Sequence, residues 1–470
     1  MFVLGIDSST QSTKAVVVEA EEGTVVSEGR SPHPSGTEID PAVWWRACLE
    51  ATRQALARSP GAVEAVSVAG QQHGMVALDG ERAPLREALL WNDTRSAPQA
   101  RELVERHGAR NLAERTGVVP VASFTLTKLA WLAENEPWLV ERLDRVLLPH
   151  DWLSWRLAGR PEWTCTDRGD ASGTGYFSPT SGEWLPELCR EVLKGRTPRL
   201  PEVLGPAERA GTAVEPVELS GAVLGPGTGD NMAAALGLGI GPGDVVVSLG
   251  TSGTAFAVSE HPIAEETGTV AGFCDATGRY LPLVCTLNAA RVLDSTARLL
   301  GTDLGGLSEL ALAAPPGAGG LTLVPYLDGE RTPDLPLATG SLTGMRTTNL
   351  TPENLARAAV EGMLCGLADG VEALRTNGVR VERVLLVGGA AESPAVRAIA
   401  PDLFGVRVLV PAPGEYVALG AAKQAAWVVS ATSRPPEWTP DCVEHPVTDA
   451  DAGAEVRNAY RRARTEVYGV

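Results

Sequence analysis

Residues 2–20, FVLGIDSSTQSTKAVVVEA, join two apolar runs through a polar turn, and this pattern indicates the fold of the whole chain. Each run has the length and composition of a buried strand, whereas the Asp, Ser and Thr residues between them favour a turn. We therefore predict a β-hairpin with carboxyl, hydroxyl and amide groups at its tip. Residues 243–261, GDVVVSLGTSGTAFAVSEH, repeat the same order of features.

The two hairpins each open about half of the chain, which predicts duplicated domains facing one another across a ligand-binding cleft. Residues 62–79 are expected to form a strand, a polar turn and a strand, and residues 381–413 a strand, a Gly-Gly turn, a helix and a strand. Asp40 and Pro41 fit the N-cap and first position of a helix. This alternation of elements is typical of an α/β fold.

Length and charge limit the possible partners of the chain. Its 470 residues predict two or three domains, and its formal net charge of −18 disfavours nucleic acid and anionic membranes. No apolar run approaches the ~18 residues that span a bilayer. The seven cysteines contain no C-x-x-C pair, so we expect neither a zinc site nor a disulfide framework. This cysteine usage fits a reducing environment, and we expect a cytoplasmic location. The sequence does not decide the oligomeric state, and a homodimer is one alternative.

Two common phosphate-binding signatures are missing from the chain. Its lysines are Lys14, Lys128, Lys194 and Lys423, and none precedes Ser or Thr, which excludes a Walker A loop. The H-R-D and D-F-G sequences of protein kinases are also absent. A nucleotide site in this protein must therefore be of another kind.

Residues 227–231, GTGDN, place the single acid Asp230 between a glycine-rich approach and an apolar run that indicates a helix. An acid in this position commonly caps the helix by accepting a hydrogen bond from a backbone N–H group. It also has the chemistry of a general base, because a carboxylate can accept a proton from a hydroxyl group. Both interpretations remain open on these five residues.

Longer segments resemble one known family. Residues 123–135, SFTLTKLAWLAEN, and residues 340–361, GSLTGMRTTNLTPENLARAAVE, are similar to the two signature patterns of the FGGY carbohydrate kinases. The resemblance implies two duplicated ribonuclease-H-like domains of the actin and sugar-kinase superfamily with an interdomain cleft. Residues 1–240 would bind the sugar and carry the catalytic acid, and residues 241–470 would bind ATP.

The resemblance also implies a substrate. Several segments, among them AGQQHGMVALD at 69–79 and YLDGERTPDLP at 326–336, are most similar to family members that phosphorylate D-xylulose. Gln71-Gln72-His73 stands where glycerol-phosphorylating members carry an Arg-Glu pair. The expected reaction converts D-xylulose to D-xylulose 5-phosphate with ATP and Mg²⁺. A kinase for ribulose, glycerol or another sugar or polyol, and a non-catalytic actin-fold ATP-binding protein, are the alternatives.

Site residues follow from the resemblance one by one. Asp230 would be the catalytic base, and the groups expected at the sugar are Gln72, His73, Asp230 and Asn231. Asp7 would hold magnesium, because a hard cation prefers carboxylate and water oxygens. The residues expected at ATP are Thr10, Thr251, Gly388 and Gly389. Val396 and Ala398 replace a tryptophan and a glutamine common in the family, which leaves the adenine contacts open.

Overall fold

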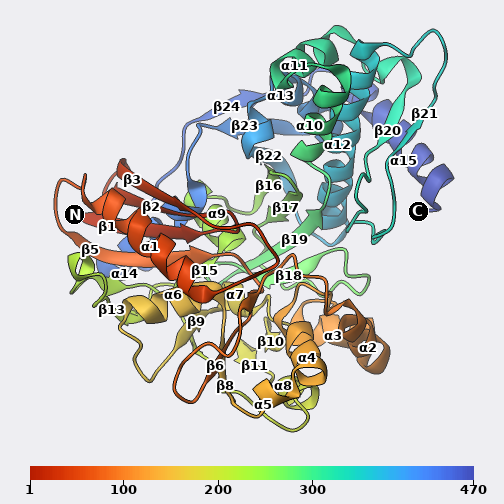
Figure 1. Ribbon diagram of the computed structural model, residues 1–470. Helices are drawn as coiled ribbons and strands as arrows, with labels where there is room; N and C mark the ends of the chain where they lie inside the picture. The colour runs from red at the N-terminus through yellow and green to blue at the C-terminus, as the bar shows by residue number, and fades with distance from the viewer. The chain divides into compact units, whose positions relative to one another are not determined.

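The computed structural model describes residues 1–470, which form two compact units (Figure 1). The first contains Met1–Gly239, Ser259–Leu281 and Gly414–Thr439, and the second contains Ile240–Val258, Pro282–Pro413 and Pro440–Val470. No single boundary in the sequence separates the two units, because two later segments pack with residues 1–239. No helix combines the length and apolarity that crossing a membrane would require.

A seven-stranded sheet forms the centre of the first unit, in the order β13-β14-β5-β1-β2-β3 with β15 also paired to β5. Its strands are β1 (Phe2–Ser8), β2 (Ser12–Glu19), β3 (Val25–Pro32), β5 (Val63–Gly70), β13 (Gly211–Thr212), β14 (Val223–Leu224) and β15 (Thr228–Gly229). The predicted first hairpin is confirmed, since β1 and β2 pair antiparallel. Strand β5 pairs parallel to β1 on its other side.

Helices cover this sheet and extend the unit. Helix α1 (Pro41–Leu56) packs on β2 and β3, and α14 (Tyr416–Ser430) packs on β1 and β5. As predicted, Asp40 caps α1, because its Oδ1 accepts a hydrogen bond from the N–H of Ala42 at 2.9 Å. The other helices are α2 (Ala97–His107), α3 (Ala109–Thr116), α4 (Thr125–Asn135), α5 (Pro137–Val140), α6 (Pro149–Leu157), α7 (Arg168–Ala171), α8 (Pro186–Val192), α9 (Asp230–Leu238) and η1 (Val217–Leu219).

Short strand pairs complete the first unit. They are β4 (Glu38–Ile39) with β7 (Ala88–Leu89), β6 (Val76–Asp79) with β8 (Leu143–Leu147), β9 (Cys165–Asp167) with β12 (Glu202–Leu204), and β10 (Phe177–Ser178) with β11 (Glu183–Trp184). Residues 62–79 thus form two strands, as predicted, but β5 and β6 belong to different sheets. The turn between them therefore connects two sheets and is not the tight turn of a β-hairpin.

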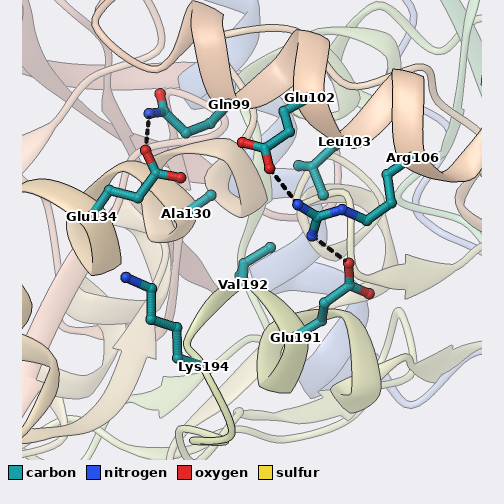
Figure 2. A pocket seen from close by; sticks show the side chains of 9 residues that line it. All are labelled: Gln99, Glu102, Leu103, Arg106, Ala130, Glu134, Glu191, Val192 and Lys194. Atoms are coloured by element: carbon teal, nitrogen blue, oxygen red, sulfur yellow. Dashed lines mark hydrogen bonds and ion pairs between the residues drawn. The ribbon is translucent and has the colours of Figure 1, made fainter.

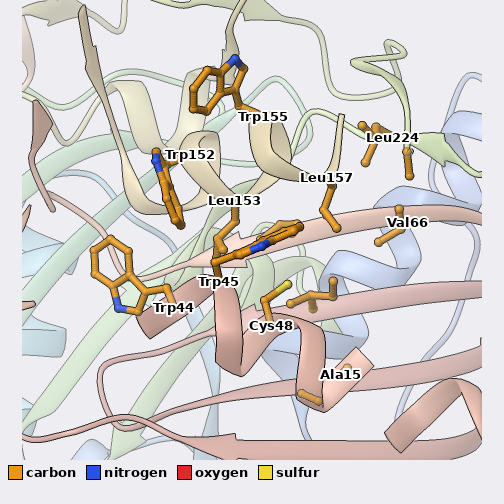
Figure 3. Packing of buried hydrophobic residues seen from close by; sticks show 14 of the residues in the cluster. Ala15, Trp44, Trp45, Cys48, Val66, Trp152, Leu153, Trp155, Leu157 and Leu224 are labelled. Atoms are coloured by element: carbon orange, nitrogen blue, oxygen red, sulfur yellow. The ribbon is translucent and has the colours of Figure 1, made fainter. Parts of the chain in front are cut away.

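Tryptophans dominate one core of the first unit (Figure 3). Trp44 and Trp45 on α1 pack with Trp152 and Trp155 on α6, and the rings of Trp44 and Trp152 meet edge to face at 6.5 Å between centroids. Such large rings remove much apolar surface from water and hold α6 against α1. This packing fixes the start of α6, where the buried residue His150 lies.

Glycines allow α14 to approach β1 and α9 closely. A Cβ atom on Gly5 would overlap the carbonyl oxygen of Ala418, and one on Gly420 would overlap that of Ala233. Only glycine permits backbones to come this close. Helix α9, and with it Asp230 at its first position, is therefore held tightly against the sheet through α14.

A second seven-stranded sheet has the order β18-β19-β17-β16-β22-β23-β24. Its strands are β16 (Gly243–Leu249), β17 (Gly253–Ala257), β18 (Ala271–Cys274), β19 (Tyr280–Thr286), β22 (Val381–Val387), β23 (Arg407–Pro411) and β24 (Cys442–His445). Further elements of this half are α10 (Ala290–Leu300), α11 (Leu304–Ala313), α12 (Pro352–Thr376), α13 (Pro394–Phe404), α15 (Ala450–Tyr468), η2 (Ala318–Gly320), η3 (Gly389–Glu392), β20 (Thr322–Val324) and β21 (Ser341–Thr343).

The predicted duplication is visible in strand order. In the first sheet, β1 pairs antiparallel with β2 and parallel with β5, and β2 pairs antiparallel with β3. In the second, β16 pairs antiparallel with β17 and parallel with β22, and β17 pairs antiparallel with β19. The α/β fold with two related sheets is thus confirmed, and residues 381–413 form the predicted strand, Gly-Gly turn, helix and strand.

Candidate active site

Three neighbouring strands of the first unit end where the candidate residues lie. Strands β15, β5 and β1 run parallel, with Gly229 opposite Gly70 and Ser8 opposite Gly70. Because the carboxyl ends of parallel strands meet at one sheet edge, ligands commonly bind there. Asp230 follows β15, the Gln72 and His73 turn follows β5, and Asp7 lies near the end of β1. The fold therefore brings these four distant positions to one edge.

Asp230 is the first residue of α9, so the N-cap position falls on Gly229. The simple capping interpretation is thus wrong in position, although Asp230 Oδ1 accepts a hydrogen bond from the backbone N–H of Asn231 at 2.8 Å. The side chain keeps some solvent exposure. Burial, followed by the charges of Asp7 and Asp170, raises the pKa of Asp230 to about 7. A carboxyl group with such a pKa suits proton transfer near neutral pH.

Asn231 links Asp230 to the β5–β6 turn. Its Nδ2 donates to Asp230 Oδ1 at 2.9 Å and to Gln72 Oε1 at 3.1 Å. The Nε2 group of Gln72 is buried without a hydrogen-bond partner in the protein. Buried polar groups are nearly always satisfied, so this amide is well suited to a bound hydroxyl group or water. The structure thus brings together three of the predicted sugar-binding residues.

His73 adopts a left-handed backbone conformation with φ of 66°. Its ring Nδ1 lies 2.7 Å from the carbonyl oxygen of Gly173. A carbonyl oxygen only accepts, so Nδ1 carries the hydrogen in this contact. The ring also packs against Phe124 and Phe273, with centroid distances of 4.8 and 5.7 Å. These contacts fix the orientation of the imidazole.

Asp7 is buried on β1 beside the ion pair between Lys14 and Glu415. Its Oδ2 accepts from the hydroxyl group of Ser9 at 2.9 Å, whereas Oδ1 is buried without a partner in the protein. Burial raises the pKa of Asp7 to about 6, against the lowering effect of Lys14. A carboxylate oxygen left without a donor fits a hard divalent cation such as Mg²⁺.

Thr10 lies in the turn between β1 and β2, where its hydroxyl oxygen accepts a hydrogen bond from Trp91 Nε1 at 2.9 Å. This contact orders the hairpin tip. Thr10 remains partly exposed, as a ligand contact requires.

Four buried titratable residues near Asp230 were not singled out from the sequence. His150, Asp151, Asp167 and Asp170 all lie in the interior of the first unit. Thr228, two residues before Asp230, donates its hydroxyl hydrogen to Asp167 Oδ2 at 2.7 Å. Residues 166–177, TDRGDASGTGYF, contain Asp167 and Asp170, but only the fold brings His150 close to both of them. The sequence thus showed two nearby acids, Asp167 and Asp170, but not that His150 lies beside them in the fold.

The remaining predicted residues lie in the second unit. Thr251 is exposed in the turn between β16 and β17. Gly388 follows β22 with φ of 93°, and a Cβ atom there would lie 2.6 Å from the carbonyl oxygen of Leu249. Gly389 is exposed, and a Cβ atom on it would meet nothing within 4 Å. Val396 is fully buried in α13, so it is a core residue of this unit.

A separate surface pocket of about 290 Å³ lies between α2, α4 and α8 (Figure 2). Its charged groups already have partners in the protein. Arg106 forms ion pairs with Glu102 and Glu191, Glu134 accepts a hydrogen bond from Gln99 at 2.6 Å, and Lys194 donates to the carbonyl oxygen of Ala133 at 3.2 Å. None of the predicted site residues lines this pocket. The pocket therefore does not belong to the candidate active site.

Comparison with protein families agrees with this arrangement of two related sheets. Residues 2–237 match the N-terminal domain of the FGGY family of carbohydrate kinases, and residues 245–429 match its C-terminal domain. The chain belongs to the FGGY family of carbohydrate kinases. It is accordingly a carbohydrate kinase, an enzyme that transfers a phosphoryl group to a sugar or related alcohol.

Individual FGGY kinases are similar over nearly the whole chain. A xylulose kinase of Streptomyces rubiginosus is 48% identical over 438 residues, covering 91% of this chain and 88% of the relative. A xylulose kinase of Streptomyces coelicolor is 47% identical over 437 residues, with coverage of 91% and 88%. The crystal structure of xylulose kinase from Bifidobacterium adolescentis is 46% identical, has a TM-score of 0.89 and covers 99% of both chains.

Proposed function

We propose that the protein phosphorylates D-xylulose to D-xylulose 5-phosphate with ATP, using Asp230 as the general base. The observation that carries the mechanism is the half-buried carboxyl group of Asp230, whose pKa lies at about 7 beside the amides of Asn231 and Gln72. The similarity to xylulose kinases at 46–48% identity supports the choice of substrate. The Gln71-Gln72-His73 turn, with neutral side chains suited to neutral hydroxyl groups, supports it further.

In the proposed step, the Asp230 carboxylate accepts the proton of the sugar hydroxyl group. The hydroxyl oxygen forms a bond to the γ-phosphorus of ATP, the bond from that phosphorus to the β–γ bridging oxygen breaks, and ADP leaves. Asn231 holds Asp230 Oδ1 through its backbone and side-chain N–H groups at 2.8 and 2.9 Å. The carboxylate is therefore oriented before the sugar binds, which lowers the cost of reaching the reactive geometry.

Gln72 and His73 would contact the sugar. Gln72 offers the buried Nε2 donor, while its Oε1 is engaged by Asn231. This arrangement couples the sugar-binding turn to the helix that carries the base. Hydrogen bonds to neutral donors and acceptors discriminate among sugars by the positions of their hydroxyl groups.

Magnesium and ATP complete the proposal. Asp7, whose buried Oδ1 has no donor in the protein, would hold the metal directly or through water. When bound, Mg²⁺ neutralises charge on the transferred phosphoryl group. Thr10, Thr251, Gly388 and Gly389 would approach the nucleotide, where glycine N–H and threonine hydroxyl groups do not repel phosphate oxygens.

A substrate screen tests the proposal. ADP release by the purified enzyme is measured with D-xylulose, ribulose, fructose, glycerol and xylitol at equal concentrations, and kcat/KM is determined for each. We expect the highest kcat/KM with D-xylulose. A clear preference for ribulose or glycerol would assign a different substrate, and no stimulation by any of the five would contradict kinase activity toward this class.

A further inference from the structure

Lys128 is a fully buried lysine in the first unit. It lies on α4 inside residues 123–135, and its Nζ donates hydrogen bonds to the carbonyl oxygens of His73 and Ser123, each at 2.7 Å. Its hydrogen bonds therefore go to backbone carbonyl groups. Burial lowers the pKa of Lys128 to about 7, and the charge of Asp93 opposes this only in part. An ammonium group in such a place is costly, and an apolar side chain would fill the space with less desolvation.

The acceptor of Lys128 belongs to the sugar-binding turn. The carbonyl oxygen of His73 accepts a hydrogen bond from Lys128 Nζ. It accepts a second one, at 3.2 Å, from the hydroxyl group of Thr125 on the same helix. His73 has φ of 66°, a conformation that residues other than glycine rarely adopt. Strained conformations persist where the surrounding structure holds them. Two donors from α4 thus hold the backbone of His73 while Gly173 holds its ring.

We propose that Lys128 is a positioning residue for sugar binding, which holds the left-handed turn at His73 and so sets the placement of Gln72 and His73. This inference rests on the proposed function, since it takes these two residues as sugar contacts. Lys128 acts through the backbone of the turn, because its hydrogen bond goes to the main-chain carbonyl oxygen of His73. Loss of its ammonium group should therefore weaken sugar binding while leaving ATP binding in place.

A second buried lysine provides a matched control. Lys423 on α14 is also buried, and its Nζ donates to the carbonyl oxygen of Trp438 at 3.1 Å. Burial lowers its pKa too, to about 8. Trp438 lies outside the candidate site, so replacement of Lys423 removes a comparable buried ammonium group without loosening the His73 turn.

The test compares Lys128→Met with Lys423→Met in the full-length enzyme. For Lys128→Met we expect the KM for D-xylulose to rise about tenfold or more, as for the loss of the two buried hydrogen bonds that Lys128 donates. The KM for ATP and kcat should stay within about threefold of wild type, consistent with lost ground-state positioning. Lys423→Met should leave the KM for D-xylulose unchanged. Calorimetric titration with D-xylulose alone should show the same difference in affinity.

Two further variants keep the result interpretable. His73→Asn retains a residue that tolerates positive φ but removes the imidazole, and adding Lys128→Met to it should raise the KM for D-xylulose little further. Thr125→Val removes the weaker donor and should raise this KM about two- to fivefold, which provides the test if Lys128→Met does not fold.

The outcomes separate the two proposals. An inactive wild-type enzyme with D-xylulose would overturn the proposed function. If wild type is active and His73→Asn weakens sugar binding, but Lys128→Met, or Thr125→Val in its place, leaves sugar affinity unchanged, only the positioning role of Lys128 is overturned. An equal effect of Lys423→Met on the KM for D-xylulose would likewise overturn it.

Discussion

Nδ1 of His150 lies 2.7 Å from Oδ2 of Asp170, and both side chains are fully buried in the first unit. On the other side of the ring, Nε2 lies 3.1 Å from Asp151 Oδ1 and 4.0 Å from Asp167 Oδ1. The ring edge also fills the space beside Gly227, where a Cβ atom would overlap it. One imidazole thus supports the loop that leads to Asp230 and offsets the charge of three carboxyl groups.

We predict that His150→Gln destabilises the protein by about 3 kcal/mol at pH 6, because it leaves buried carboxylates without their cation. Burial alone would lower the pKa of His150, but the three aspartates raise it to about 9. The stabilisation is therefore complete below the unfolded pKa of about 6.5 and is lost as the pH rises through 9. Urea midpoints at pH 6, 7.5 and 9.5 should show a shrinking difference from wild type.

His107→Gln serves as the control for this experiment. His107 pairs with Glu191 at 3.0 Å near the surface, where an ion pair contributes about 0–1 kcal/mol. A pH-independent effect of His150→Gln, or one no larger than that of His107→Gln, would show that the His150 ring carries no stabilising charge.

Asp230→Asn should lower kcat by about 10²–10⁴, equivalent to roughly 3–5 kcal/mol of barrier, because the amide cannot accept the hydroxyl proton. Affinity for D-xylulose should persist, since the amide keeps the size of the carboxylate. The folded protein should not lose stability, because the substitution removes a desolvated carboxylate. Steady-state kinetics, sugar titration and urea unfolding measure these three quantities, and near-normal kcat would exclude Asp230 as the base.

The pH profile provides an independent check on Asp230. Because its pKa is raised to about 7 and the base must be ionised, kcat/KM should fall as the pH drops through about 7. Asp170→Asn removes one of the charges that raise this pKa, so the acidic limb of the profile should move to lower pH. A shift to higher pH, or none, would contradict the electrostatic coupling between Asp170 and Asp230.

Gly389→Val should raise the KM for ATP more than the KM for D-xylulose, because the added side chain occupies space next to the proposed nucleotide turn. The variant should fold normally, since a Cβ atom on Gly389 meets nothing within 4 Å. Gly388→Val, by contrast, should lower stability, because its backbone is left-handed and its Cβ would crowd Leu249. Unchanged ATP kinetics in folded Gly389→Val would remove this turn from the site.

Local pattern in the sequence was sufficient for the hairpins, the cap of α1 and the strand–helix–strand order of residues 381–413. These features depend on neighbours a few residues apart, whose polarity and turn chemistry are readable directly. The duplication was readable for the same reason, since residues 2–20 and 243–261 carry the same local order. The signature segments indicated the family but assigned no task to Lys128.

Tertiary structure decided which of these groups meet. Lys128 reaches the carbonyl oxygen of His73 across 55 positions of sequence, and Asp170 reaches His150 across 20. The compact units also depend on long-range packing, because α14 from the C-terminal half covers β1 and β5. Hydropathy marks a residue as buried or exposed, whereas the partner of a buried charge is set by strand register and helix packing. That is why the family resemblance in the sequence was enough to predict a catalytic role for Asp230. The buried charged residues near it became visible only in the fold.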